Sequence, residues 1–129
     1  MKSLKLVLFG FFVFLSVPFL SAQQLDIPQN ILAGLEDGNA ANISDSFNSS
    51  IEMVVGSQDD VYSKQQASVI LNDFFRKNRV VGFEIKHKGT KESASFVIGS
   101  LKTSTGNYRV YILIRKSQIQ QLRIENSNE

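Results

Sequence analysis

Residues 80–88 read VVGFEIKHK, and three more stretches of alternating side chains follow before the chain ends. These are SASFVIGSLK (93–102), NYRVYILIRK (107–116) and QIQQLRIE (118–125). Turn-forming segments separate the four stretches, with a tight break near Ser117. Alternation with a period of two residues indicates β-strands. The last third of the chain therefore predicts a meandering antiparallel sheet of four strands.

Apolar side chains fall on both faces of these predicted strands. On the first strand Phe83, Ile85 and His87 share a face, and on the fourth Leu122 and Ile124 do. A flat sheet with one solvent face does not need this pattern, whereas a bent sheet that wraps a helix and is covered on its other face does. The side chains expected to need such a cover form a candidate interaction face: Arg109, Tyr111, Leu113, Arg115, Leu122 and Ile124.

A first helix is predicted around residues 27–35. Ile27, Ile31 and Leu35 recur at four-residue spacing and give one apolar stripe. Asp26 is expected to cap the start of this helix, and Gly38 is expected to end it in a left-handed conformation.

A short helix, a strand and a loop are predicted next. Asn39 is expected to cap a helix over residues 40–47. Residues 51–55 read IEMVV and indicate a short strand with Glu52 facing outward. Residues 56–60 are polar and predict a loop.

The clearest helix begins after Ser63. Ser63 and Gln66 have the spacing of a capping box, in which each side chain bonds the backbone of the other residue. Apolar residues then follow at helical spacing: Ala67, Ile70, Leu71, Phe74 and Phe75. Three bases close the segment, where cations suit the helix dipole: Arg76, Lys77 and Arg79.

Residues 1–22 have the pattern of a secretory signal peptide. Lys2 and Lys5 begin it, an uncharged apolar run follows, and Pro18 breaks that run shortly before the expected cleavage site. The run is shorter than the roughly 20 residues that span a membrane. We therefore expect an exported protein, periplasmic or secreted, with one domain over residues 23–129 and no membrane span after cleavage.

Charge is divided unevenly along this expected mature chain. The full sequence has 14 Lys and Arg against 12 Asp and Glu, and the loss of Lys2 and Lys5 makes the two classes equal. Residues 23–60 contain acids and no base, while most bases follow residue 61. A net charge of zero gives no support for nucleic-acid binding. The division favours either an acidic helical layer against a basic sheet or a basic sheet face that meets an anionic partner.

The predicted order is α-α-β-α-β-β-β-β, which resembles the nuclear-transport-factor-2-like fold, also called cystatin-like. In that α+β cone, a curved antiparallel sheet wraps around an N-terminal helical layer and one long helix. Beyond the fold, the chain resembles an uncharacterised family of small exported Bacteroidetes proteins, known only as a domain of unknown function. Three stretches carry this resemblance: DIPQNILAGLEDGNAANIS, VYSKQQASVILNDFF and TGNYRVYILIRKSQIQQLRIE. They contain no catalytic signature, so the resemblance implies no site residues.

Some relatives with this cone fold use a pocket between the sheet and the long helix for isomerase or dehydratase chemistry. Such a site needs a carboxylate base and hydroxyl donors aimed at a developing oxyanion. The candidates are Asp73 on the long helix, the lone histidine His87, and Tyr108 on an apolar strand face. For His87 a place at the surface or at a hairpin edge is the simpler interpretation.

The sequence offers no converging metal ligands, because it has one histidine, no cysteine and scattered acids. It also lacks a glycine-rich phosphate loop, so we expect no cofactor.

These observations lead to one predicted function and two alternatives. We predict an exported, non-enzymatic module that binds a small apolar ligand in a pocket, or a partner such as a second copy on its open sheet face. The first alternative is a small lyase or isomerase that uses Asp73 or His87 with a tyrosine. The second is an envelope component whose basic sheet meets an acidic partner.

Overall fold

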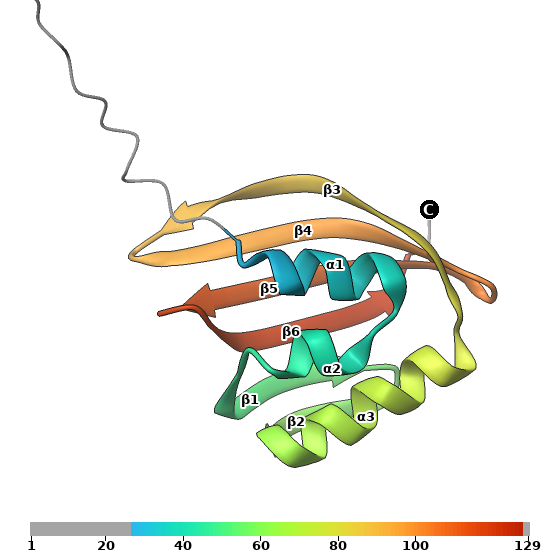
Figure 1. Ribbon diagram of the computed structural model, residues 1–129, viewed down its shortest axis with the longest axis horizontal. Coiled ribbons are helices and arrows are strands. Elements are labelled where there is room, and N and C mark those ends of the chain that lie inside the picture. Colours follow the sequence, from blue (N-terminus) through green and yellow to red (C-terminus); the bar gives the residue numbers. More distant parts are fainter. Residues whose placement is uncertain (1–26, 128–129) are drawn as a thin grey trace, which may run out of the picture.

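The computed structural model describes residues 27–127 of the chain. The predicted signal peptide and the capping role of Asp26 lie outside these residues. The described part consists of the following helices and strands (Figure 1). In chain order they are α1 (Gln29–Asp37), α2 (Ala40–Ser44), β1 (Phe47–Val55), β2 (Gln58–Ser63), α3 (Lys64–Lys77), β3 (Val80–Lys91), β4 (Ala94–Thr103), β5 (Gly106–Arg115) and β6 (Gln118–Asn126).

The strands form one sheet in the order β2-β1-β6-β5-β4-β3. The predicted meander of β3, β4, β5 and β6 is confirmed, with antiparallel pairing throughout. Strands β1 and β2 form a separate antiparallel hairpin, and β1 joins the sheet by pairing parallel to β6. The sheet is therefore mixed, and the last strand of the chain lies in its interior.

The three helices lie on one face of this sheet, which we call the inner face; the opposite face is the outer face. In Figure 1, β3 arches over α1 at one edge of the sheet, while α3 lies along β1 and β2 at the other edge. Both edges therefore curve toward the helices, which confirms the predicted α+β cone. Between the two layers lies a core of aliphatic side chains with Phe47, Phe74 and Phe75.

Residues 56–60 do not form the predicted loop. Only Gly56 and Ser57 turn the chain, and β2 starts at Gln58. The segment QDDVYS has two aspartates, which strands disfavour. It is nevertheless a strand because it lies at the edge of the sheet, where most of its side chains remain in water.

The second helix is shorter than predicted. Asn39 caps it as expected, with its side-chain oxygen accepting from the Asn42 N–H at 3.1 Å. The helix ends at Ser44, however, and Phe47 begins β1 with its side chain fully buried. Placing Phe47 in the sheet core therefore overrides the helical pattern of residues 40–47.

Both other helices have the predicted ends. Gly38 follows α1 with a φ of 67°, in the left-handed conformation. At the start of α3, the Ser63 hydroxyl accepts from the Gln66 N–H at 3.1 Å, and the Ser63 N–H donates to Gln66 Oε1 at 3.2 Å. The capping box is thus complete.

Bulges in β3 and β6 change which side chains share a face. In β3, Ile85 pairs with Gly99 but His87 pairs with Ile98, so Lys86 is an extra residue. Each extra residue reverses the alternation beyond it and bends the strand. Phe83 and Ile85 consequently lie on the inner face and His87 on the outer face, so the prediction that the three share one face is wrong.

The ion pairs do not join an acidic layer to a basic sheet. Within residues 27–127, every ion pair closer than 4 Å joins side chains of a single element. These pairs are Asp73 with Arg76, Asp73 with Lys77, Glu84 with Lys86, and Glu125 with Arg123. The acids of residues 27–59 therefore take part in none of these ion pairs.

Candidate functional site

The three catalytic candidates lie in different environments. Asp73 is on the solvent side of α3, where its side chain is 47% exposed. Its Oδ2 lies 3.1 Å from Lys77 Nζ and its Oδ1 lies 3.6 Å from Arg76. These are exposed pairs within one helix, which contribute little to stability. Nothing in this position desolvates the carboxylate as a general base would require.

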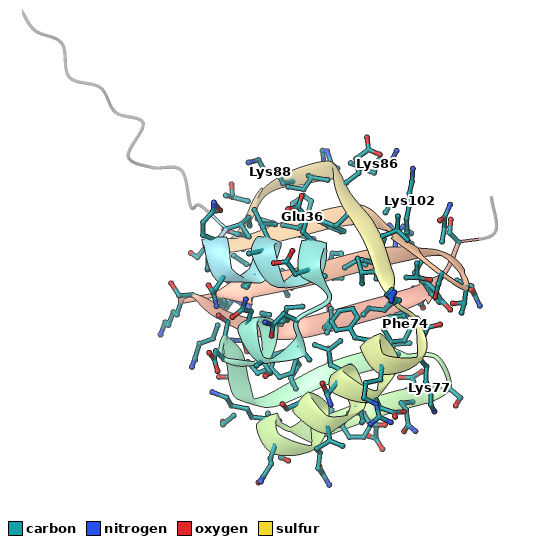
Figure 2. All side chains as sticks on the ribbon, turned by 45° about the vertical axis from the view of Figure 1, so that its right-hand side comes forward. Glu36, Phe74, Lys77, Lys86, Lys88 and Lys102 are labelled. Carbon is teal, nitrogen blue, oxygen red and sulfur yellow. The ribbon has the colours of Figure 1, made fainter. Side chains whose placement is uncertain are left out.

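Tyr108 lies on the inner face, opposite the buried Leu101 and at the end of α3. Its ring meets Phe74 edge to face with centroids 5.1 Å apart, and its hydroxyl donates to Asn78 Oδ1 at 3.3 Å. The Asn78 side-chain nitrogen donates to the Phe74 carbonyl at 2.8 Å, and the Thr105 hydroxyl also donates to Asn78 Oδ1. Figure 2 shows Phe74 between α3 and the sheet. This network joins the end of α3 to the turn between β4 and β5.

His87 is exposed on the outer face, where its ring lies 5.5 Å from that of Phe96. Since Tyr108 is on the inner face and Asp73 on the outside of α3, the structure does not bring the three candidates into one pocket.

A surface groove of about 740 Å³ lies between β2 and α3. Tyr62, Gln66, Val69 and Ile70 are among its lining residues, and a neighbouring groove of about 360 Å³ shares Val69 and Ile70 and includes Asp73. Neither His87 nor Tyr108 lines either groove. This is where a small apolar ligand would find a concave surface beside the long helix.

Within residues 27–127 there is no group of three or more His, Cys, Asp or Glu side chains that could hold a metal ion. No helix of that range has both the length and the hydrophobicity needed to cross a membrane.

The outer face of the sheet has no helix over it in the described chain (Figure 1). Its side chains follow two rows that cross all six strands, as the strand registers fix. From β3 to β2, the first row is His87, Ile98, Tyr111, Arg123, Val54 and Asp59. The second row is Gly89, Phe96, Leu113, Gln121, Glu52 and Val61.

The centre of these rows is apolar and only partly shielded. Ile98, Tyr111, Phe96 and Leu113 form adjacent pairs on β4 and β5, and each is half-buried. Val61, at the β2 end of the second row, is 56% exposed. In the described chain all helices lie on the other side of the sheet, so only neighbouring strands shield these side chains (Figure 1).

Two residues were wrongly assigned to the predicted interaction face. Leu122 and Ile124 are both 0% exposed and belong to the core, opposite Ile112 and Val110. The cause is the bulge in β6: Leu113 pairs with Gln121 while Ile114 pairs with Ile119, which leaves Gln120 extra. The side chains beyond Gln120 therefore change faces, and the outer face of β6 is polar.

The other four residues of the predicted interaction face lie on the outer face. Further charged side chains of both signs lie on the same face. Arg109 and Arg115 are exposed on β5, next to the apolar centre. Glu125 on β6 is the register partner of Arg109 and lies 2.9 Å from Arg123. Toward β2, Glu52 and Asp59 line a shallow groove of about 340 Å³ together with Arg123 and Val61. The outer face thus runs from a basic side on β5 to an acidic side on β1 and β2.

The contribution of β1 and β2 to this face is absent from the predicted set. The local signal was the outward Glu52 in IEMVV, which the structure confirms as exposed. What places it beside Gln121 is the parallel pairing of β1 with β6, across about seventy residues of sequence. No local pattern encodes such a pairing.

The model of the family described as Domain of unknown function (DUF4783) matches residues 28–125. No curated protein matches the sequence. A crystal structure of a DUF4783 family protein from Bacteroides ovatus is 33% identical, with a TM-score of 0.74, and the match covers 80% of this chain and 97% of that one. A second, from Bacteroides fragilis, is 29% identical with a TM-score of 0.74, covering 79% of this chain and all of the other.

A more distant structure, a domain of unknown function with a cystatin-like fold from Nostoc punctiforme, is 9% identical. It superposes with a TM-score of 0.62, and the match covers 78% of this chain and 73% of that one. At this identity the likeness concerns the fold alone, and it confirms the cystatin-like architecture expected from the element order.

Proposed function

The chain belongs to the family described as Domain of unknown function (DUF4783), and from that premise we propose that it is a non-enzymatic binding module that joins a second copy of itself through the outer face of its sheet. The observation that carries this proposal is the apolar centre of the outer face, formed by Phe96, Ile98, Tyr111 and Leu113 without a helix over it. Contiguous apolar surface of this kind, rimmed by polar groups, is typical of protein interfaces.

The edges of the sheet favour association through the face. At the β2 edge, the Val61 N–H donates to the carboxylate of Asp60 at 2.7 Å, and the Ser63 N–H donates to Gln66 Oε1. At the other edge, residues 86–91 of β3 begin at the Lys86 bulge and carry further lysines, whereas residues 82–85 pair regularly with β4. Occupied N–H groups, bulges and lysines are devices that discourage strand addition.

Charge complementarity supports a second copy as the occupant. A two-fold axis parallel to the strands, between β5 and β6, places β5 of one copy over β6 of the other. Arg109 then faces Glu125 of the second copy, and Tyr111 faces Arg123, a pairing that suits a cation over an aromatic ring. Because both sheet edges curve away from the outer face, contact centred on β5 and β6 is the natural geometry.

We propose in addition that the protein acts outside the cytoplasm. The support is the signal-peptide pattern of residues 1–22. Expression of the full chain with a C-terminal tag, followed by cell fractionation and N-terminal sequencing, tests this: the expected product is exported and begins near Gln23. A full-length cytoplasmic product contradicts it.

Sedimentation velocity of residues 23–129 tests the self-association directly. We expect a dimer that dissociates on dilution over roughly 1 to 100 µM, the range of a modest protein interface. Spin labels on exposed β5 positions should report a partner label at short distance. A monomer throughout this range, or a dimer whose labels on β5 remain far apart, overturns the proposal.

A further inference from the structure

A second surface lies on the inner side of the molecule, at the corner between α1 and the edge strand β3. Four residues of α1 at helical spacing line it: Gln29, Leu32, Ala33 and Glu36. Three consecutive residues of β3 complete a groove of about 500 Å³: Phe83, Glu84 and Ile85. This stripe of α1 is separate from the buried stripe of Ile31 and Leu35, so the short helix presents apolar side chains on two sides.

The floor of this groove is apolar and open. Leu32 is half-buried, Ala33 is exposed, and Ile85 is 37% exposed on the inner face. The cross-strand partner of Ile85 is Gly99, and the ring of Phe83 fills the space that a side chain at residue 99 would take. With a volume of about 500 Å³, the groove has room for one large apolar side chain between Leu32 and Ile85.

The rim is acidic. Glu36, which lines the groove, has no ion pair within residues 27–127. Glu84 is exposed, and its carboxylate forms an ion pair with Lys86 Nζ at 3.5 Å. Figure 2 labels Glu36 on α1 below β3, the strand that carries Lys86. A cation that approaches the groove from solvent thus meets carboxylates from both elements.

The backbone beside the groove is free to pair with another strand. Strand β3 is at the end of the sheet order, so its second edge has no strand beside it in the described chain. Residues 82–85 pair with β4 without interruption, between the two irregularities of β3. They form a short, regular edge next to the groove, unlike β2, where Asp60 and Gln66 occupy the N–H groups.

We propose that this α1–β3 groove binds a short extended segment of a partner protein in which a large apolar residue is followed by two Lys or Arg residues. The segment adds to the edge at residues 82–85. Alternation then directs the apolar side chain inward onto Leu32 and Ile85, the first cation outward to Glu84, and the second cation inward to Glu36. The site is independent of the outer face and of self-association there.

The capped pentapeptide Ac-TIKKT-NH2 is the probe, titrated into ¹⁵N-labelled residues 23–129. We expect saturable binding with a Kd of roughly 100 µM, typical of a short strand-adding peptide, and shifts confined to α1 and residues 80–86. The acidic peptide Ac-TIEET-NH2, and Ac-TIKKT-NH2 with all backbone N–H groups methylated, should bind at least about tenfold more weakly, a loss of about 1.4 kcal/mol.

Matched variants locate the site. Ala33→Arg fills the groove and adds a cation at an exposed helix position that tolerates arginine, and it should weaken binding about tenfold or more. Asp37→Arg makes a larger charge change one residue from Glu36 but does not line the groove, so it should change the Kd less than about threefold. The proposal would be overturned by shifts that map elsewhere, by equal binding of the acidic probe, or by no binding at millimolar peptide. Shifts in the groove that appear without peptide as protein concentration rises would instead identify a second copy as its occupant, and would also overturn it.

Discussion

The ring of Phe83 lies against Gly99 across the hairpin of β3 and β4, so closely that a β-carbon at residue 99 would be 2.4 Å from Phe83 Cζ. The same β-carbon would be 2.7 Å from the Glu84 carbonyl oxygen, which belongs to the backbone and cannot rotate away. A glycine that lets an aromatic ring cover it from the neighbouring strand is a known device for bending a sheet without losing its packing. Here it allows β3 to curve over α1.

Gly99→Ala is therefore expected to destabilise the fold by about 1 to 3 kcal/mol, the usual cost of forcing extra volume into a packed site. Urea unfolding followed by circular dichroism measures this. Gly82→Ala is the matched control, because a β-carbon at residue 82 meets no atom within 4 Å. Equal losses in the two variants would mean that the Phe83 contact does not set the requirement for glycine.

Replacing the apolar centre of the outer face should weaken self-association while leaving the fold intact. Leu113→Asp places a charge among Phe96 and Gln121 on a half-buried site, and we expect the dimer Kd to rise by more than about tenfold. Val69→Asp on α3 is the control, because Val69 is 66% exposed on the inner side of the molecule. An equal rise in the dimer Kd for both variants would show that the interface is elsewhere.

A charge-reversal experiment tests the proposed two-fold axis. Arg109→Glu alone places two acids opposite each other across the axis, and Glu125→Arg alone places two bases there, so each variant should self-associate more weakly. A mixture of the two should form a heterodimer, because every acid then faces a base. Sedimentation of the separate and mixed variants at low salt gives the comparison. Failure of mixing to restore the dimer contradicts this register of the two sheets.

The guarded edge of β2 gives a further prediction. Asp60→Ala frees the Val61 N–H, whose present acceptor is the Asp60 carboxylate at 2.7 Å. An exposed edge with a free donor and an adjacent valine should promote edge-to-edge association, seen as larger species in light scattering on storage. Asp59→Ala removes the same charge without releasing the Val61 N–H, so the light scattering of this variant should remain unchanged on storage.

The sequence was informative wherever a local pattern decides the structure. The capping box at Ser63, the left-handed Gly38 and the alternation of β3 to β6 all depend on residues within a few positions of each other, and each was predicted correctly. The bulges at Lys86 and Gln120 are different, because an extra residue leaves the composition of a strand unchanged and shows only in the pairing. They explain why His87, Leu122 and Ile124 were assigned to the wrong faces.

The candidate site was predictable in part for the same reason. Arg109, Tyr111, Leu113 and Arg115 lie on β5, which pairs regularly with β4, so simple alternation places them together. The acidic side of the outer face depends on β1 and β2. These strands reach the sheet through a long-range parallel pairing, and β2 has a composition that favours a loop.

Strand β6 follows the other five strands of the sheet in the sequence and connects the two halves of the sheet, since β1 pairs on one side of it and β5 on the other. A nascent chain therefore holds a hairpin and a three-stranded meander that have no common sheet until residues 118–126 have been synthesised. Because β6 completes the sheet, stable folding is delayed until this strand has been synthesised. For a chain that we propose to be exported, this order of events favours passage through a translocation channel before the sheet is complete.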